Sequence, residues 1–130
     1  MTLRIGEISL DCDDPEVLAT FWAGALGYRV TGRDHVSVQI SGDDTAPTIL
    51  FQRTGDPRLG KNRWHLDLCP VMPSERDAEV ERLLRLGARH IDIGQDPASP
   101  WVVLADPEGN ELCVMSSVLP PEPQPFPRGE

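Results

Sequence analysis

The stretch WVVLADPEGNELCVM, residues 101–115, contains two short apolar runs joined by a turn. Its first run is rich in valine and leucine, which suits a strand in a hydrophobic environment. Asp106, Pro107 and Gly109 occupy the first, second and fourth turn positions, where a type I turn prefers these residue types. In the second run the side chains alternate between two faces. The stretch therefore predicts a β-hairpin, and we expect Cys113 to point toward the functional face.

The size and composition of the chain predict a single globular domain. Its 130 residues are 39% hydrophobic and 25% charged, which is ordinary for a globular protein. No apolar run approaches the roughly 18 residues that a membrane helix needs, and residues 1–10 contain one arginine and no long apolar region. We therefore expect a cytoplasmic protein with no membrane partner.

The charges and the cysteines argue against further classes of protein. A formal net charge of −9 repels phosphate backbones, so we expect no nucleic-acid partner. The three cysteines, Cys12, Cys69 and Cys113, are an odd number and form no CxxC pair. This pattern argues against a disulfide framework and against a zinc site built from thiolates, and it favours reduced thiols.

The first half of the chain has the order strand, helix and three strands. Alternating residues predict a strand over residues 3–11, and Asp13 and Asp14 can cap a helix that begins at Pro15. Apolar residues at helical spacing then lead to Leu26-Gly27, a pair typical of a helix end. Three short runs bounded by glycine, aspartate or proline predict strands over residues 28–30, 35–40 and 48–52.

The second half repeats this order. Residues 64–68 predict a strand, Ser74 and Asp77 resemble a capping box, and Leu86-Gly87 ends the helix as Leu26-Gly27 does. Three strands are then predicted over residues 89–93, 101–104 and 111–115. The two leucine-glycine pairs are 60 residues apart. We interpret the two halves as one duplicated β-α-β-β-β unit rather than as an open repeat array.

The duplication defines the predicted domain organisation. We expect one domain over residues 1–119, with a first module over about 3–53 and a second over about 63–118. Residues 120–130 form a proline-rich tail that is a poor candidate for pairing into a sheet.

This arrangement resembles the vicinal oxygen chelate superfamily, in particular its glyoxalase-like branch near the bleomycin-resistance and dioxygenase relatives. The resemblance is carried by PEVLATFWAGALGY (15–28), KNRWHLDL (61–68) and LADPEGNELCV (104–114). It implies an α+β fold in which two β-α-β-β-β modules form a cup-shaped mixed sheet with the helices outside. It also implies that a ligand or a metal lies inside the cup and that the protein is a homodimer.

In metal-dependent relatives, as the resemblance implies, one divalent ion is bound from the first and last strands of each module. The corresponding positions here are Glu7, His65 and Cys113, with the fourth position on Phe51 or Gln52. Cys113 stands where metal-dependent relatives usually carry glutamate, and neither candidate for the fourth position is a carboxylate. Hard ions prefer carboxylate and imidazole ligands, whereas zinc could accept Glu7, His65 and Cys113 with a water. We expect no metal cofactor, with zinc or a similar divalent ion as the alternative.

Strand alternation predicts which side chains face the interior of the cup. If Leu10 and Leu66 pack under the helices, their neighbours Ser9 and Asp67 point the other way. Trp101 has two interpretations, a core residue or a ring that stacks on a ligand, and Phe21, Trp22 and Trp64 are expected in the core or an interface. The predicted ligand-binding residues are Glu7, Ser9, Gln52, His65, Asp67, Trp101 and Cys113.

Two functions remain open from the sequence. The first is a binding protein whose apolar cup, with a few polar anchors, holds a small molecule without the usual metal. The second is a metal-dependent lyase or isomerase of glyoxalase type, in which Glu7 would be the catalytic base or a ligand and His65 a ligand. Metal content separates the two.

Overall fold

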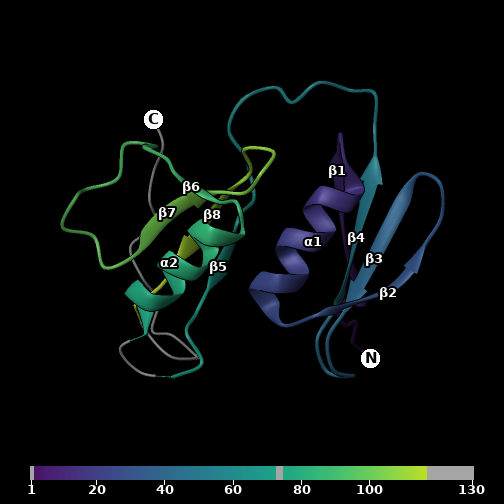
Figure 1. The fold of residues 1–130 in the computed structure, drawn as a ribbon, viewed down its shortest axis with the longest axis horizontal. Coiled ribbons are helices and arrows are strands. Elements are labelled where there is room, and N and C mark those ends of the chain that lie inside the picture. The colour runs from purple at the N-terminus through teal and green to yellow at the C-terminus, as the bar shows by residue number, and fades with distance from the viewer. Residues whose placement is uncertain (1, 73–74, 117–130) are drawn as a thin grey trace. The chain divides into compact units, whose positions relative to one another are not determined.

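The computed structural model describes residues 2–72 and 75–116, and the chain divides into two compact units, residues 1–59 and 60–130. Each unit is described by itself. The first contains β1 (Glu7–Cys12), α1 (Pro15–Leu26), β2 (Arg29–Arg33), β3 (Ser37–Ser41) and β4 (Thr48–Arg53). The second contains β5 (Leu66–Leu68), α2 (Arg76–Leu86), β6 (Arg89–His90), β7 (Val102–Ala105) and β8 (Glu111–Val114). The predicted duplication of β-α-β-β-β is thus confirmed (Figure 1).

The two sheets have the same topology. Their strand orders are β1-β4-β3-β2 and β5-β8-β7-β6. In each sheet the first and last strands of the unit pair in parallel, and the remaining neighbours pair antiparallel. The helix and the two strands that follow it form the long connection that parallel neighbours require. The fold is therefore α+β with two mixed four-stranded sheets, as predicted.

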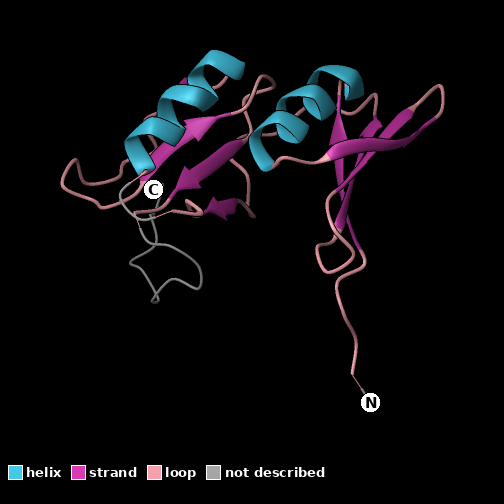
Figure 2. Cartoon of the chain, turned by 60° about the horizontal axis from the view of Figure 1, so that its bottom comes forward, coloured by secondary structure: helices cyan, strands magenta, loops and turns pink. Residues whose placement is uncertain are grey.

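The core of the first unit lies between α1 and one face of its sheet. The helix contacts β3 and β4, and Figure 2 shows it beside the strands of this unit. Leu18 and Phe21 of the helix are buried, as are Ile40 and Phe51 of the sheet. The opposite face of β1 and β4 carries the polar side chains, because neighbouring residues of a strand point to opposite faces.

The second unit repeats this separation of faces. Helix α2 contacts β8, and its residues Val80 and Leu83 are buried. Leu104 of β7 and Leu112 of β8 are directly opposed in the sheet and fully buried. The hairpin between these strands contains the predicted turn: the Gly109 amide donates to the Asp106 carbonyl at 2.8 Å, and Gly109 has a positive φ of 88°.

Three of the four helix ends have the capping residues that the sequence predicts, and the start of α2 is the exception. The Asp14 side chain accepts a hydrogen bond from the Val17 amide, and Gly27 and Gly87 end the helices in the left-handed conformation. The expected capping box is not the start of α2: its N-cap is Glu75, which makes no side-chain capping bond, and Ser74 lies outside the described residues.

Two other expectations need correction. The strand predicted over residues 89–93 ends at His90, because the Gln95 side chain accepts from the Ile93 amide and donates to the Ile91 carbonyl. Trp64 is 90% exposed and is not a core residue of the described chain. The predicted domain limits remain predictions, and the proline-rich tail lies outside the described residues. Among the described residues, neither helix is long and apolar enough to cross a bilayer.

Candidate ligand-binding face of the second sheet

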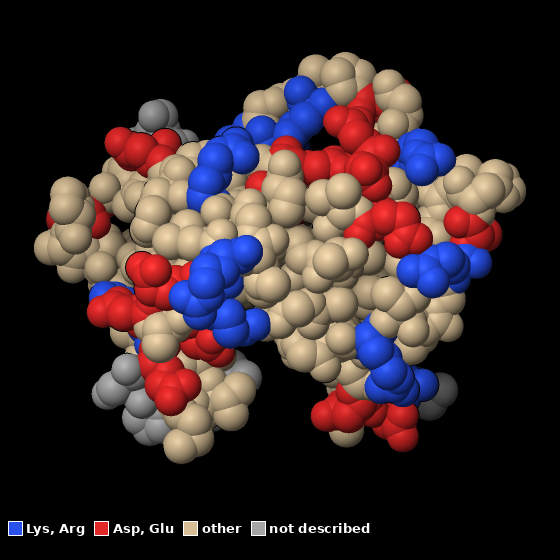
Figure 3. Space-filling model, viewed as in Figure 1, with Lys and Arg blue, Asp and Glu red and all other residues tan. Residues whose placement is uncertain are grey.

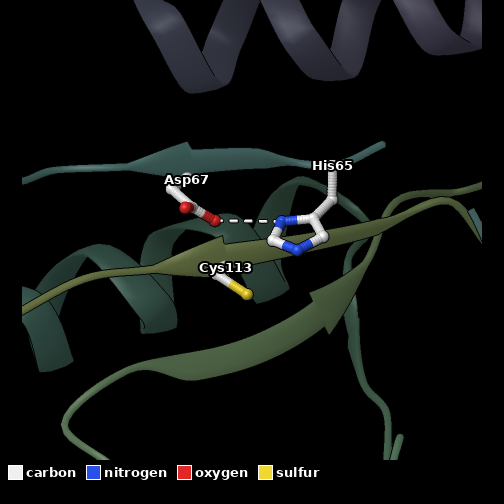
Figure 4. A group of neighbouring side chains, drawn as sticks. All are labelled: His65, Asp67 and Cys113. Atoms are coloured by element: carbon white, nitrogen blue, oxygen red, sulfur yellow. Dashed lines mark ion pairs between the residues drawn. The ribbon is translucent and has the colours of Figure 1, made fainter. Parts of the chain in front are cut away.

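A polar cluster lies at the junction of β5 and β8. Asp67 and Cys113 are directly opposed in the parallel pair, so their side chains share one face of the sheet. His65, two residues before Asp67, lies on that face too, and Figure 4 shows its ring and the Asp67 carboxylate pointing toward one another. The His65 Nδ1 atom is 2.9 Å from the Asp67 Oδ1 atom. Three of the predicted ligand-binding residues are therefore brought together.

The His65 and Asp67 side chains differ in their exposure to solvent. The His65 side chain is 2% exposed, whereas the Asp67 side chain is 37% exposed. The Asp67 carboxylate therefore lies within ion-pair distance of a buried imidazole and is itself still open to solvent.

Cys113 is a protonated thiol at neutral pH. Burial, the negative charge of Asp67 and a hydrogen bond from the thiol to Asp67 raise its pKa from 9.0 to about 12, against a smaller opposing effect of Lys61. Only 2% of the residue is exposed. The thiol therefore acts as a buried hydrogen-bond donor to Asp67, and it is neither a reactive thiolate nor a ready metal ligand at pH 7.

Glu111 is a buried carboxylate on this face that the predicted ligand-binding set omits. It is 6% exposed, and its Oε2 atom accepts from the Asn62 backbone amide at 3.0 Å. The Asn62 side chain also donates to the Glu111 carbonyl, at 3.2 Å. The alternation that selects Cys113 also selects Glu111, so strand periodicity was the signal that could have identified it.

The same face becomes apolar away from this polar corner. Val103 of β7 is directly opposed to Cys113, and both pack in one buried cluster with Trp101 and Met115. Partly buried hydrophobic residues pack against this cluster; they are Cys69, Ile91 and Ile93. Trp101 is 7% exposed, so it belongs to this cluster as well as to the predicted ligand-binding set. The second sheet therefore presents a polar corner beside an apolar wall.

The remaining predicted residues belong to the first unit. Glu7 is exposed, and its Oε2 atom accepts from Gln39 at 3.0 Å and from Thr48 at 3.1 Å. Ser9 is exposed on the same strand. For the fourth position of the metal set, Phe51 is fully buried and Gln52 is exposed, so only Gln52 offers a polar group to solvent. The pairing of Glu7 with His65 remains a prediction, because the two lie in different units.

The residues at the metal positions implied by the resemblance do not fit a divalent ion of the usual kind. Cys113 is a protonated thiol in an apolar cluster, and Gln52 is a neutral amide. Within the described ranges, donor atoms of His65, Asp67 and Cys113 lie within 4.8 Å of one another. A tetrahedral zinc site needs ligand atoms roughly 3.6 Å apart, given bond lengths of about 2.0–2.3 Å. The His65 and Asp67 donor atoms, 2.9 Å apart, already lie inside this spacing, and binding of an ion would require the Cys113 thiol to lose its proton.

The visible surface of the protein has no large patch of only positive or only negative side chains. Figure 3 shows Lys and Arg interspersed with Asp and Glu on the visible face. The excess of acidic over basic residues, 21 against 12, nevertheless makes the chain anionic as a whole. Its long-range field therefore favours approach of cations over anions.

The fold and the motifs can be compared with known proteins. The sequence model of the glyoxalase-like domain family matches residues 7–115. A glyoxalase/bleomycin resistance protein/dioxygenase family enzyme from Burkholderia phytofirmans PsJN is 16% identical, with a TM-score of 0.68, and the match covers 84% of this chain and 94% of that chain. No curated protein matches this chain in sequence.

Two fosfomycin resistance proteins named FosX share the fold. One is from Mesorhizobium loti, with 12% identity, a TM-score of 0.68, and coverage of 92% of this chain and 95% of that chain. The other, a mutant from Listeria monocytogenes complexed with Mn(II) and 1S,2S-dihydroxypropylphosphonic acid, has 15% identity, a TM-score of 0.70, and coverage of 92% and 94%. At these identities the likeness shows the fold alone.

Proposed function

We propose that this chain, which belongs to the glyoxalase-like domain family, binds a small molecule without the divalent-metal site of its metal-dependent relatives. The binding surface would include the face of the second sheet that carries His65, Asp67 and Cys113. Binding faces of this kind combine an apolar wall with a few polar anchors. The buried cluster around Trp101 supplies the wall, and Asp67 with His65 supplies the anchors.

The state of Cys113 carries this proposal. A metal ligand at this position must be a thiolate, and a thiol with a pKa of about 12 is protonated at pH 7. Metal binding would therefore have to offset proton release as well as the loss of the Cys113–Asp67 hydrogen bond. Asp67, in contrast, is half-exposed and can accept a hydrogen bond or pair with a positive group of a ligand.

Metal content is the direct test of the metal-free part of this proposal. The chain is purified without chelator and without an affinity metal, and elemental analysis counts divalent ions per chain. We expect far fewer than one ion per chain and no change in Tm on adding EDTA. One tightly held ion per chain would overturn the metal-free assignment.

Ligand binding is tested by thermal shift, because a molecule that binds only the folded state raises Tm by mass action. A metabolite library is screened against the wild type, Asp67→Asn and Asp44→Asn. Asp44 is an exposed aspartate of the first unit and serves as the matched control. We expect the shifts to weaken in Asp67→Asn and to persist in Asp44→Asn. Shifts that are equal in both variants would contradict a role for Asp67.

The alternative function is a metal-dependent lyase or isomerase that uses Glu7 and His65. The observation that favours it is the close approach of the donor atoms of His65, Asp67 and Cys113. Under this alternative, His65→Ala loses both bound metal and turnover, whereas Ser9→Ala retains the metal. Unchanged metal content in His65→Ala would exclude the alternative.

A further inference from the structure

The second unit contains a pocket beside the apolar wall. It has a volume of about 530 Å³ and lies between β7 and the loop that follows β6. Its apolar lining includes Ile91, Trp101 and Val103, and its polar lining includes His90, Asp92 and Asp96. A volume of this size suits a small organic molecule. Because Val103 is directly opposed to Cys113, the pocket adjoins the polar cluster on the same face of the sheet.

Trp101 brings an unsatisfied donor to the wall of this pocket. The residue is more than nine-tenths buried, and its indole Nε1 atom has no hydrogen-bond partner among the described residues. A buried N–H without an acceptor is unfavourable, and buried indole nitrogens usually have a partner. Because this nitrogen is closed to solvent, the ring must turn before a ligand can reach it; an oxygen that then accepts from the N–H removes the cost, so binding favours a hydrogen-bond acceptor.

The rim of the pocket is acidic. Asp92 and Asp96 are both exposed, and each uses its Oδ1 atom to accept one backbone amide, from Gly94 and Ala98 respectively. The described residues that line the pocket include no lysine or arginine. The second oxygen of each carboxylate can therefore bind a positive group. Arg76 donates to the Pro100 carbonyl of the same loop, and it is paired with Asp77 at 2.9 Å.

We propose that this pocket binds an organic cation that has an apolar body, an ammonium group for Asp92 and Asp96, and an oxygen acceptor for the Trp101 indole. This inference names the ligand class and rests on the proposed binding function. The acidic rim also agrees with the anionic chain, whose field attracts cations. An anion of the same shape could not form ion pairs with Asp92 and Asp96 and would be repelled by their carboxylates.

The probes are tyramine and 4-hydroxyphenylacetate, which share a phenol ring and differ in the sign of the charged group. Titration calorimetry at low ionic strength measures both Kd values. We expect tyramine to bind at least tenfold more tightly than 4-hydroxyphenylacetate, with the preference falling as salt is added. No saturable binding of tyramine, or equal binding of the two probes, overturns the proposal.

Variants locate the two halves of the interaction. Asp92→Asn combined with Asp96→Asn should weaken tyramine binding about tenfold, and Trp101→Phe, which keeps a ring but removes the N–H, about fivefold. Asp44→Asn in the first unit is the matched control and should leave the Kd unchanged. Retained affinity in the double aspartate variant refutes the cation assignment, even if Trp101→Phe is too unstable to measure.

Nuclear magnetic resonance supplies a readout specific to the indole. The chain has three tryptophans, so its spectrum has three indole N–H signals, and the one absent in Trp101→Phe belongs to Trp101. Tyramine should move this signal downfield because the N–H acquires an acceptor. If Asp67→Asn abolishes metabolite binding while tyramine leaves the Trp101 signal unmoved, the pocket assignment fails and the proposed function stands. A tyramine-dependent shift that is the same in Asp67→Asn supports the pocket alone.

Discussion

The raised pKa of Cys113 makes a quantitative prediction about stability at alkaline pH. The folded chain holds the thiol proton more tightly than the unfolded chain, since the pKa is about 12 in the folded state against an ordinary value of 9.0. This contribution is therefore complete below pH 9 and is lost as the pH rises toward 12. Relative to pH 7, the loss is about 1 kcal/mol at pH 10 and about 3 kcal/mol at pH 11.

The variant Cys113→Ala isolates this contribution. It loses the thiol and its hydrogen bond to Asp67, so it should be less stable than the wild type at pH 7 by roughly 1–3 kcal/mol. Because alanine does not titrate, the difference in free energy of unfolding between the two proteins should narrow by about 1 kcal/mol at pH 10. Urea unfolding of both proteins at a series of pH values from 7 to 11 gives the two free energies of unfolding.

Two further variants control for other alkaline titrations. Cys69→Ala removes a second thiol whose pKa is also raised, by burial and by Asp67, but keeps Cys113, so it should lose less stability with pH than the wild type and more than Cys113→Ala. Asp67→Asn keeps the buried thiol but removes the negative charge that, after burial, raises the pKa of Cys113. This variant should therefore lose less stability between pH 7 and pH 10 than the wild type does. If the difference in free energy of unfolding between the wild type and Cys113→Ala is the same at pH 7 and pH 10, the conclusion that Cys113 is a buried protonated thiol is wrong.

Other predictions test the hairpin, the helix cap and the assembly. Asp106→Ala should lower the free energy of unfolding by about 2–4 kcal/mol, because its buried carboxylate accepts from the Glu108 and Asn110 amides; thermal denaturation measures this. Asp14→Ala should cost about 1 kcal/mol in the same assay, whereas Asp14→Ser, which can still cap, should cost less. The expected homodimer should show a mass of twice 14.4 kDa in light scattering, and a monomeric mass would contradict it.

The elements of secondary structure were largely predictable from the sequence because their signals are local. Asp14 before Pro15, and glycine after each helix, determine where the backbone can begin or leave the helical conformation. The limits of β6 were not predictable in this way. They depend on the Gln95 side chain, which takes backbone hydrogen bonds that a longer strand would have needed.

The candidate site could be predicted only in part. Alternation predicted that Asp67 and Leu66 point to opposite faces of the strand, and the resemblance pointed to His65 and Cys113. Neither could show that Glu111 is buried and bonded to Asn62, or that the Trp101 indole lacks an acceptor among the described residues. Burial and hydrogen bonding of a side chain depend on segments that are distant in sequence, and a single sequence contains no direct record of them.

The sequence by itself determined that the chain folds as two β-α-β-β-β units, and its resemblance to metal-dependent relatives predicted that Cys113 stands where they usually carry a carboxylate. Caps, turns and strand alternation act between near neighbours, so they can be read along the chain. Only the tertiary structure decided the state of that thiol. The register of β5 against β8 joins residues 46 positions apart, and it places Asp67 against Cys113 where burial and negative charge together retain the proton.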